Sequence, residues 1–145
     1  MGILGTSAST VSDINLIVQI IIIALLAEGW IISRDKKKIR LHGQLMVTAV
    51  LINAAAIALV MLPSLILNFG AITSDPLGPG PLITIAHSTI GAAAWLLGAY
   101  LSWVWGLKPA TVECFKRKGL MRPVTYLWLF AAILGVGFYV YYYVL

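Results

Sequence analysis

The residues of this chain that could do chemistry are few, and three of them are possible ligands for a soft metal. His42 and Met46 are four residues apart, which places them on one face of a helix. Cys114 is the only cysteine. Imidazole, thioether and thiolate suit Cu(I), so these residues form a candidate metal site. The alternative, which we favour because no CxxC, HxxxH or Met-rich run is present, is that His42 only touches lipid phosphates or a partner at the membrane edge.

The two histidines, His42 and His87, raise the question of haem, because two imidazoles can ligate one haem iron. We expect His42 at the start of the second helix and His87 about six residues inside the third, which enters from the opposite surface. The imidazoles should then be ~20 Å or more apart, whereas the two ligands of one iron are ~4 Å apart. A bis-histidine haem within one copy is therefore not expected.

The remaining polar residues of the apolar segments are expected to have structural partners, because an unpaired polar group in lipid costs several kcal/mol. Asn53 should form a hydrogen bond across the bundle. His87 should be satisfied by a neighbouring helix, or else contribute to a ligand or docking contact with another subunit. Glu28 should extend toward Arg34 or the lysine cluster, in preference to relaying protons.

The elements that must position these residues follow from composition. The chain has 145 residues, of which 61% are hydrophobic and 10% charged, and its mean hydropathy is +0.97. A soluble domain has about 25% charged residues. Apolar runs long enough to cross a bilayer as helices lie at 14–33, 41–67, 81–107 and 123–145. The sequence predicts one all-α membrane domain, 1–145, folded as an antiparallel bundle of four transmembrane helices.

Local signals predict where some of these helices begin and end. We expect Ser12 and Asp13 to cap the first helix. Pro123 should lie in the first turn of the fourth helix, where its missing N–H is harmless. An aromatic belt at the outer membrane surface should contain Tyr139, Tyr141, Tyr142 and Tyr143.

The cations predict the orientation in the membrane. All ten Lys and Arg residues fall in the segments 34–40 and 108–122, and the net charge is +5. The positive-inside rule places both segments in the cytoplasm and both chain ends outside, in the plasma membrane. Such clustering favours anionic phospholipids over nucleic acid as the partner. The expected lipid contacts are Lys36, Lys37, Lys38, Arg40, Lys116, Arg117, Lys118 and Arg122.

Several short motifs suggest a family. They are "EGW" before the first basic segment, "RLHGQLM" after it, and "LMRPVTYLWLFAAILGVGFYVYYYV" at the end. From about Glu28 to the last residue, the chain resembles the CtaM/YozB-like proteins, small bacterial and archaeal membrane proteins that share a domain of unknown function. The fourth helix carries the closest likeness, with Arg122, Trp128, Gly135 and Tyr139 at the family's spacing.

The resemblance implies a role beside haem–copper terminal oxidases, because the family is linked to their maturation. It also implies that His42 and His87 are retained family histidines. Family members typically carry further histidines in the outer loop and just before the fourth helix. Here the outer loop has none and Arg117 occupies the latter position, so the chain resembles the family's scaffold more than its histidine set.

The function expected from these observations is not enzymatic. The sequence shows no nucleophile–base pair, no paired carboxylates and no phosphate-binding glycine loop, and it shows no internal repeat typical of transporters. We expect an accessory subunit or an assembly factor of a larger membrane enzyme, either a haem–copper oxidase or a copper-dependent membrane monooxygenase. No cofactor and no soluble substrate are expected. The alternative is a small membrane protein that binds haem or copper for redox chemistry or metal handling.

Overall fold

The structure, a computed structural model, describes residues 2–107 and 116–145, apart from the side chains of Lys36 and Leu107. This part of the chain is helical and contains no strand. In chain order the elements are α1 (Thr10–Ile32), the 3₁₀ turn η1 (Lys36–Lys38), α2 (Ile39–Ala56), the π-helical η2 (Ile57–Met61), α3 (Leu62–Leu67), α4 (Phe69–Ser74), α5 (Pro79–Leu107) and α7 (Lys118–Tyr143). The four helical segments long and apolar enough to cross a membrane are α1, α2 to α3, α5 and α7, as predicted.

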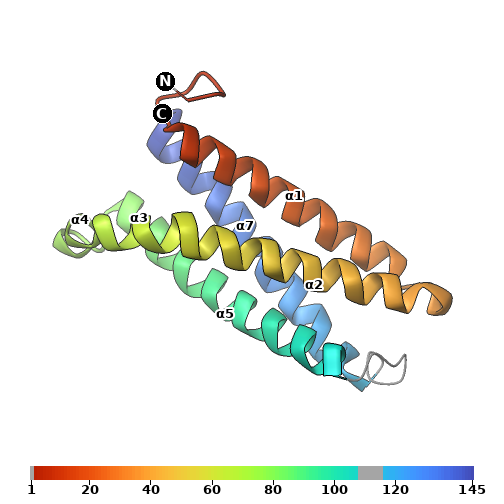
Figure 1. The fold of residues 1–145 in the computed structure, drawn as a ribbon. Helices are drawn as coiled ribbons and strands as arrows, with labels where there is room; N and C mark the ends of the chain where they lie inside the picture. Colours follow the sequence, from red (N-terminus) through yellow and green to blue (C-terminus); the bar gives the residue numbers. More distant parts are fainter. Residues whose placement is uncertain (1, 108–115) are drawn as a thin grey trace.

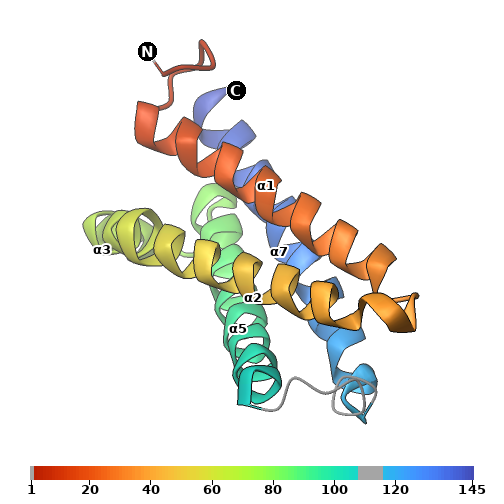
Figure 2. The same cartoon turned by 45° about the vertical axis from the view of Figure 1, so that its right-hand side comes forward.

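The four spans form two antiparallel pairs that pack on each other (Figure 1). Helix α1 packs mainly on α2, and α5 mainly on α7. Contacts of α2 with α5 and of α1 with α7 join the two pairs into one bundle. The two chain ends lie together, as Figures 1 and 2 both show. We call this the terminal end, and we call the opposite end, where α1 and α5 finish and α2 and α7 begin, the basic end.

The predicted caps of two helices are wrong. Helix α1 begins at Thr10, and its cap is Ser9, whose Oγ accepts the backbone N–H of Ser12 at 3.1 Å. Asp13 is therefore inside the helix and not at its cap. Helix α7 begins at Lys118, so Pro123 is one turn further along the helix than expected. The missing N–H of this proline therefore falls inside the helix, where it removes one bond of the backbone ladder near the basic end.

The second span changes its winding on the way to the terminal end. The five residues of η2 form a π-helical turn, in which the Leu62 N–H bonds the carbonyl of Ile57. Pro63 follows immediately, at the start of α3. A proline lacks an N–H and its ring crowds the carbonyl four residues earlier, so a wider turn before it relieves the conflict without breaking the span.

The core lies where the two helix pairs meet. It consists of Ile22, Leu26, Ala49, Val50, Ala94 and Trp128, all buried. Glycines let large rings approach the helix backbones at this contact. A Cβ added at Gly43 would overlap the indole of Trp105, and one added at Gly98 would lie 2.6 Å from the indole of Trp128. Close approach through small residues is what holds helices together in lipid, where the hydrophobic effect is absent.

This packing makes a testable prediction at Gly43. We expect Gly43→Ala to lower the free energy of unfolding by ~1–3 kcal/mol, because the new methyl group has no space beside Trp105. The matched control is Gly106→Ala, since an added Cβ at that helical position meets open space. Unfolding of the purified protein in mixed micelles measures both. Equal stability of the two variants would show that the indole does not lie on Gly43.

Candidate functional site

His42 is buried in the bundle and bonded to the neighbouring helix. Its Nδ1 lies 2.8 Å from the carbonyl oxygen of Gly29 in α1. A carbonyl oxygen only accepts, so Nδ1 carries the hydrogen and donates it. The same oxygen also accepts the N–H of Ser33 at 3.0 Å. The expected contact of this imidazole with lipid phosphates is therefore wrong, because the ring turns inward to satisfy a carbonyl.

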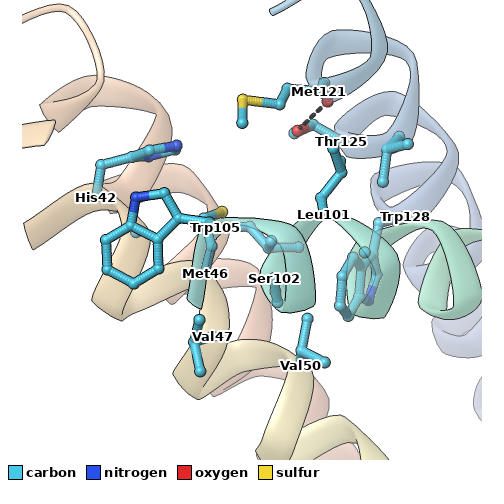
Figure 3. Close-up of a pocket in the computed structure, with 14 residues that line it drawn as sticks. His42, Met46, Val47, Val50, Leu101, Ser102, Trp105, Met121, Thr125 and Trp128 are labelled. Atoms are coloured by element: carbon cyan, nitrogen blue, oxygen red, sulfur yellow. Dashed lines mark hydrogen bonds between the residues drawn. The ribbon is translucent and has the colours of Figure 1, made fainter. Parts of the chain in front are cut away.

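A pocket opens beside this histidine at the basic end (Figure 3). Its volume is about 70 Å³, and its wall is mostly apolar. The residues that line it come from α1, α2, α5 and α7, and include His42, Met46, Ser102, Trp105, Met121, Thr125 and Trp128. In Figure 3 the side chain of Met121 extends from α7 toward the α2 side of the pocket. Drug-sized ligands occupy roughly 300–1,000 Å³, so this space suits a few waters or an ion.

The donor atoms around the pocket are of types that suit a soft metal. In the neutral ring of His42, protonation of Nδ1 leaves a lone pair on Nε2, and metal-binding histidines commonly donate their other N–H to a carbonyl in this way. Met46 and Met121 add two thioethers to the same pocket. Cys114, the third predicted ligand, lies outside the described residues. In the described ranges, no group of three or more His, Cys, Asp or Glu residues is placed to hold a metal ion.

His87 lies far from this pocket. Its Nδ1–H donates to the carbonyl of Ala131 in α7 at 2.8 Å, so the prediction that a neighbouring helix satisfies it is confirmed. On the same helix, α5, Trp105 packs against Gly43 beside His42. At 1.5 Å per residue, His87 and Trp105 are separated by about 27 Å along the helix. The two imidazoles are therefore not placed to share one haem iron.

The other predicted polar contacts have mixed outcomes. Asn53 is buried, and its Oδ1 accepts the side-chain N–H of Gln19 in α1 at 3.3 Å, which confirms a hydrogen bond across the bundle. Glu28 is exposed. The contact predicted between Glu28 and Arg34 does not form, because the guanidinium of Arg34 lies over the ring of Trp30 instead.

A buried carboxylate at the terminal end was not predicted. Asp13 is fully buried, and its Oδ1 accepts the hydroxyl of Tyr139 in α7 at 2.5 Å. Its Oδ2 accepts the backbone N–H of Leu4 at 2.9 Å. The oxygen of Tyr139 accepts in turn from the hydroxyl of Thr6 at 2.8 Å. These bonds fasten the first residues of the chain, α1 and α7 to one another.

Tyr143 extends this network by one turn. Its hydroxyl accepts from Ser12 at 3.3 Å, and its carbonyl accepts the hydroxyl of Ser7 at 3.0 Å.

The prediction that Tyr139 belongs to an outer aromatic belt is wrong, because its side chain is buried and bonds to Asp13 of α1. The sequence did offer a signal for the Asp13–Tyr139 bond. An even number of spans places residue 13 and residue 139 at the same end of the bundle.

The predicted lipid-contacting cations lie at the basic end, and most of their side chains are exposed. Those exposed are Lys37, Lys38, Arg40, Lys116, Lys118 and Arg122. Arg117 is half-buried, and its guanidinium donates to the hydroxyl of Tyr100 at 3.0 Å. The side chain of Lys36 is outside the described part of the structure.

Comparison with models of protein families, with curated proteins and with solved structures found no match. The resemblance to the CtaM/YozB-like proteins therefore stays a prediction that rests on the quoted motifs.

The terminal network makes a prediction about stability. We expect Tyr139→Phe to lower the free energy of unfolding by ~1–3 kcal/mol, because it removes a hydroxyl donor from a buried carboxylate. Tyr141→Phe is the control, since Tyr141 is partly exposed and lies on the same final turns of α7. Denaturation in micelles compares the two, and hydrogen exchange of residues 2–9 should rise only in Tyr139→Phe. Equal behaviour of the two variants would contradict a role for the Asp13–Tyr139 bond.

Proposed function

We propose that this protein is a non-catalytic accessory subunit or assembly factor of a larger membrane enzyme. One observation carries the proposal. The buried polar side chains of the described residues, Asp13, His42 and Asn53, are each hydrogen-bonded to another part of the same chain. Their hydrogen bonds hold helices together, which favours a scaffold over a reaction centre. A scaffold of this kind acts through its outer surface.

The outer surface supports a partner within the membrane. Large apolar side chains are exposed on every span, among them Ile20, Leu59, Leu96, Trp103 and Ile133. The described segments outside the spans are short, so most of the surface that a partner can meet is lateral. Aromatic anchors on such faces, like Trp103 at 70% exposure, are frequent in interfaces between proteins.

The proposed host is a respiratory haem–copper oxidase, and the proposal rests here on the resemblance to the CtaM/YozB-like proteins. A copper-dependent membrane monooxygenase is the other host that we consider. The proposed location is the plasma membrane, with the basic end in the cytoplasm and both chain ends outside. The clustering of all ten cations in two segments supports this orientation.

A second candidate function is the handling of Cu(I). It is favoured by the pocket in which His42, Met46 and Met121 meet, and by the Gly29 carbonyl that orients the imidazole. When bound, Cu(I) would be held by Nε2 of the histidine and by thioether sulfurs. The chain's own part would be to exclude water through the apolar wall and to fix the ring by the bond to Gly29. This function is compatible with a role in the maturation of a copper enzyme.

One purification separates the two candidates. We expect the tagged protein, extracted in mild detergent, to carry the large subunits of a membrane enzyme, and deletion of its gene to impair assembly of that enzyme. The variants His42→Ala and His87→Ala should still support assembly in so far as they fold, because the accessory role uses neither imidazole as a metal ligand. Near-stoichiometric copper or a Soret band in the purified protein, lost in His42→Ala but retained in Met61→Leu, would favour the second candidate. Purification without any larger polypeptide, together with normal assembly after deletion, would refute the accessory role.

A further inference from the structure

Two aromatic rings meet where α1 and α7 approach each other at the basic end. The ring of Trp30 in α1 contacts that of Tyr126 in α7 edge to face, with centroids 6.4 Å apart and planes at 78°. Neither ring is enclosed, since Trp30 is 46% and Tyr126 is 58% exposed. The pair therefore forms a surface that is open to the side of the bundle.

Each of these rings has an arginine four residues away in the sequence. The guanidinium carbon of Arg34 lies 5.8 Å from the centroid of Trp30. Arg122 precedes Tyr126 by four residues, so it lies on the same face of α7, one turn nearer the basic end. Helix α1 runs toward the basic end and α7 runs away from it, so both arginines lie beyond the rings in the same direction. Both side chains are exposed.

Below the rings, the surface continues as an apolar stripe. Phe130 and Ile133 follow Tyr126 on the same face of α7, and both are exposed. From the basic end inward, the order is therefore two cations, two amphipathic rings and an apolar track. This is the order of a phosphate, a glycerol backbone and an acyl chain along the membrane normal.

We propose that Arg34 and Arg122 bind the phosphate of one anionic phospholipid, whose glycerol region packs on Trp30 and Tyr126. The planar fork of a guanidinium matches phosphate oxygens with two parallel hydrogen bonds. The rings suit the boundary between headgroups and hydrocarbon, where their polar atoms meet water and their faces meet acyl chains. An acidic peptide would match the arginines but not the apolar stripe, so the lipid fits the whole surface better.

Three of the other cations of the basic end are placed differently. Arg117 donates its guanidinium N–H to Tyr100 on α5, away from the Trp30–Tyr126 pair. Lys37 and Lys38 belong to the short η1 turn. They attract anionic lipid through charge alone, whereas the pair at the α1–α7 contact combines charge with a shaped apolar surface. The proposal thus adds Arg34, which was not among the eight predicted lipid contacts, and selects Arg122 from those eight.

The test compares two double variants that lose the same charge. Arg34→Gln/Arg122→Gln removes the proposed phosphate ligands, and Lys37→Gln/Lys38→Gln removes two cations away from the rings. Each full-length protein, in neutral micelles, is titrated with phosphatidylglycerol or phosphatidylcholine, and bound lipid is counted by native mass spectrometry. The wild type should bind one phosphatidylglycerol in preference to phosphatidylcholine. We expect the arginine variant to bind it about 25-fold more weakly, at about fivefold for each cation that contacts the bound phosphate. The lysine variant, whose lost cations do not contact that phosphate, should differ by less than about threefold.

One further variant and one further measurement separate lost binding from a lost fold. Arg34→Lys/Arg122→Lys retains the charge and loses the fork, so its affinity should lie between those of the wild type and the glutamine variant. An unchanged free energy of unfolding for Arg34→Gln/Arg122→Gln would show that its weaker lipid binding does not come from a lost fold. If that variant does not fold, the lipid affinity of Arg34→Lys/Arg122→Lys is the test: an affinity equal to that of the wild type would overturn the proposal. If both glutamine variants bind phosphatidylglycerol equally weakly, general surface charge explains the binding and the proposal is overturned. Equal binding of the two lipids, or an acidic polypeptide in place of lipid on the purified protein, would also overturn it.

Discussion

The structure depends on the fact that lipid offers no hydrogen-bond partner. A buried polar group in a membrane helix must therefore find its partner within the protein. In this chain several of these partners are found on neighbouring helices, and each of the four contacts between spans, α1–α2, α2–α5, α5–α7 and α1–α7, has at least one such bond. The bonds are His42 to Gly29 and Gln19 to Asn53 between α1 and α2, Trp95 to Val50 between α2 and α5, His87 to Ala131 between α5 and α7, and Tyr139 to Asp13 between α7 and α1. Polar residues thus fix which helix faces lie together.

Three of these five bonds end on a backbone carbonyl. Both histidines and Trp95 donate to carbonyl oxygens that belong to another helix. Small residues make this possible, because the ring of His42 approaches α1 at Gly29 and that of His87 lies against Gly135 on α7. The histidines that first suggest metal or haem chemistry therefore have a structural role in orienting helices. Only His42 keeps a second nitrogen beside a pocket that contains other soft donors.

The sequence predicted the spans well and the bonds between them less well. Hydropathy and the alternation of basic and neutral loops are properties of whole segments, so four helices and their antiparallel order were predictable. The bond of Asn53 was also predictable, because a lone amide in the middle of a span must be satisfied. The π-helical turn before Pro63 and the inward direction of Asp13 depend instead on how one helix rotates against the next. Rotation is set by side-chain packing, for which a single sequence gives no direct signal.

The same reason explains what was missed at the basic end. We expected Arg34 to pair with Glu28, but its guanidinium lies over the ring of Trp30. That ring in turn contacts Tyr126 of α7, which is some ninety residues later in the sequence. Charge counts predicted that this end contacts anionic lipid, but not which two cations share an aromatic surface. Distant residues become neighbours only through the contact between α1 and α7.

The orientation of the four-span bundle can be tested most directly by labelling, which shows whether the two basic segments lie on one side of the membrane and the terminal end on the other. Single cysteines at exposed positions, introduced with Cys114→Ser, would report on this: Lys37→Cys and Lys118→Cys at the basic end, Ile3→Cys and Leu77→Cys at the terminal end. A membrane-impermeant thiol reagent is applied to intact cells and then to inverted vesicles. If the basic end is cytoplasmic, the first two cysteines react only in inverted vesicles and the last two only in intact cells. Reaction of Lys37→Cys and Lys118→Cys from opposite sides would contradict the four-span bundle itself.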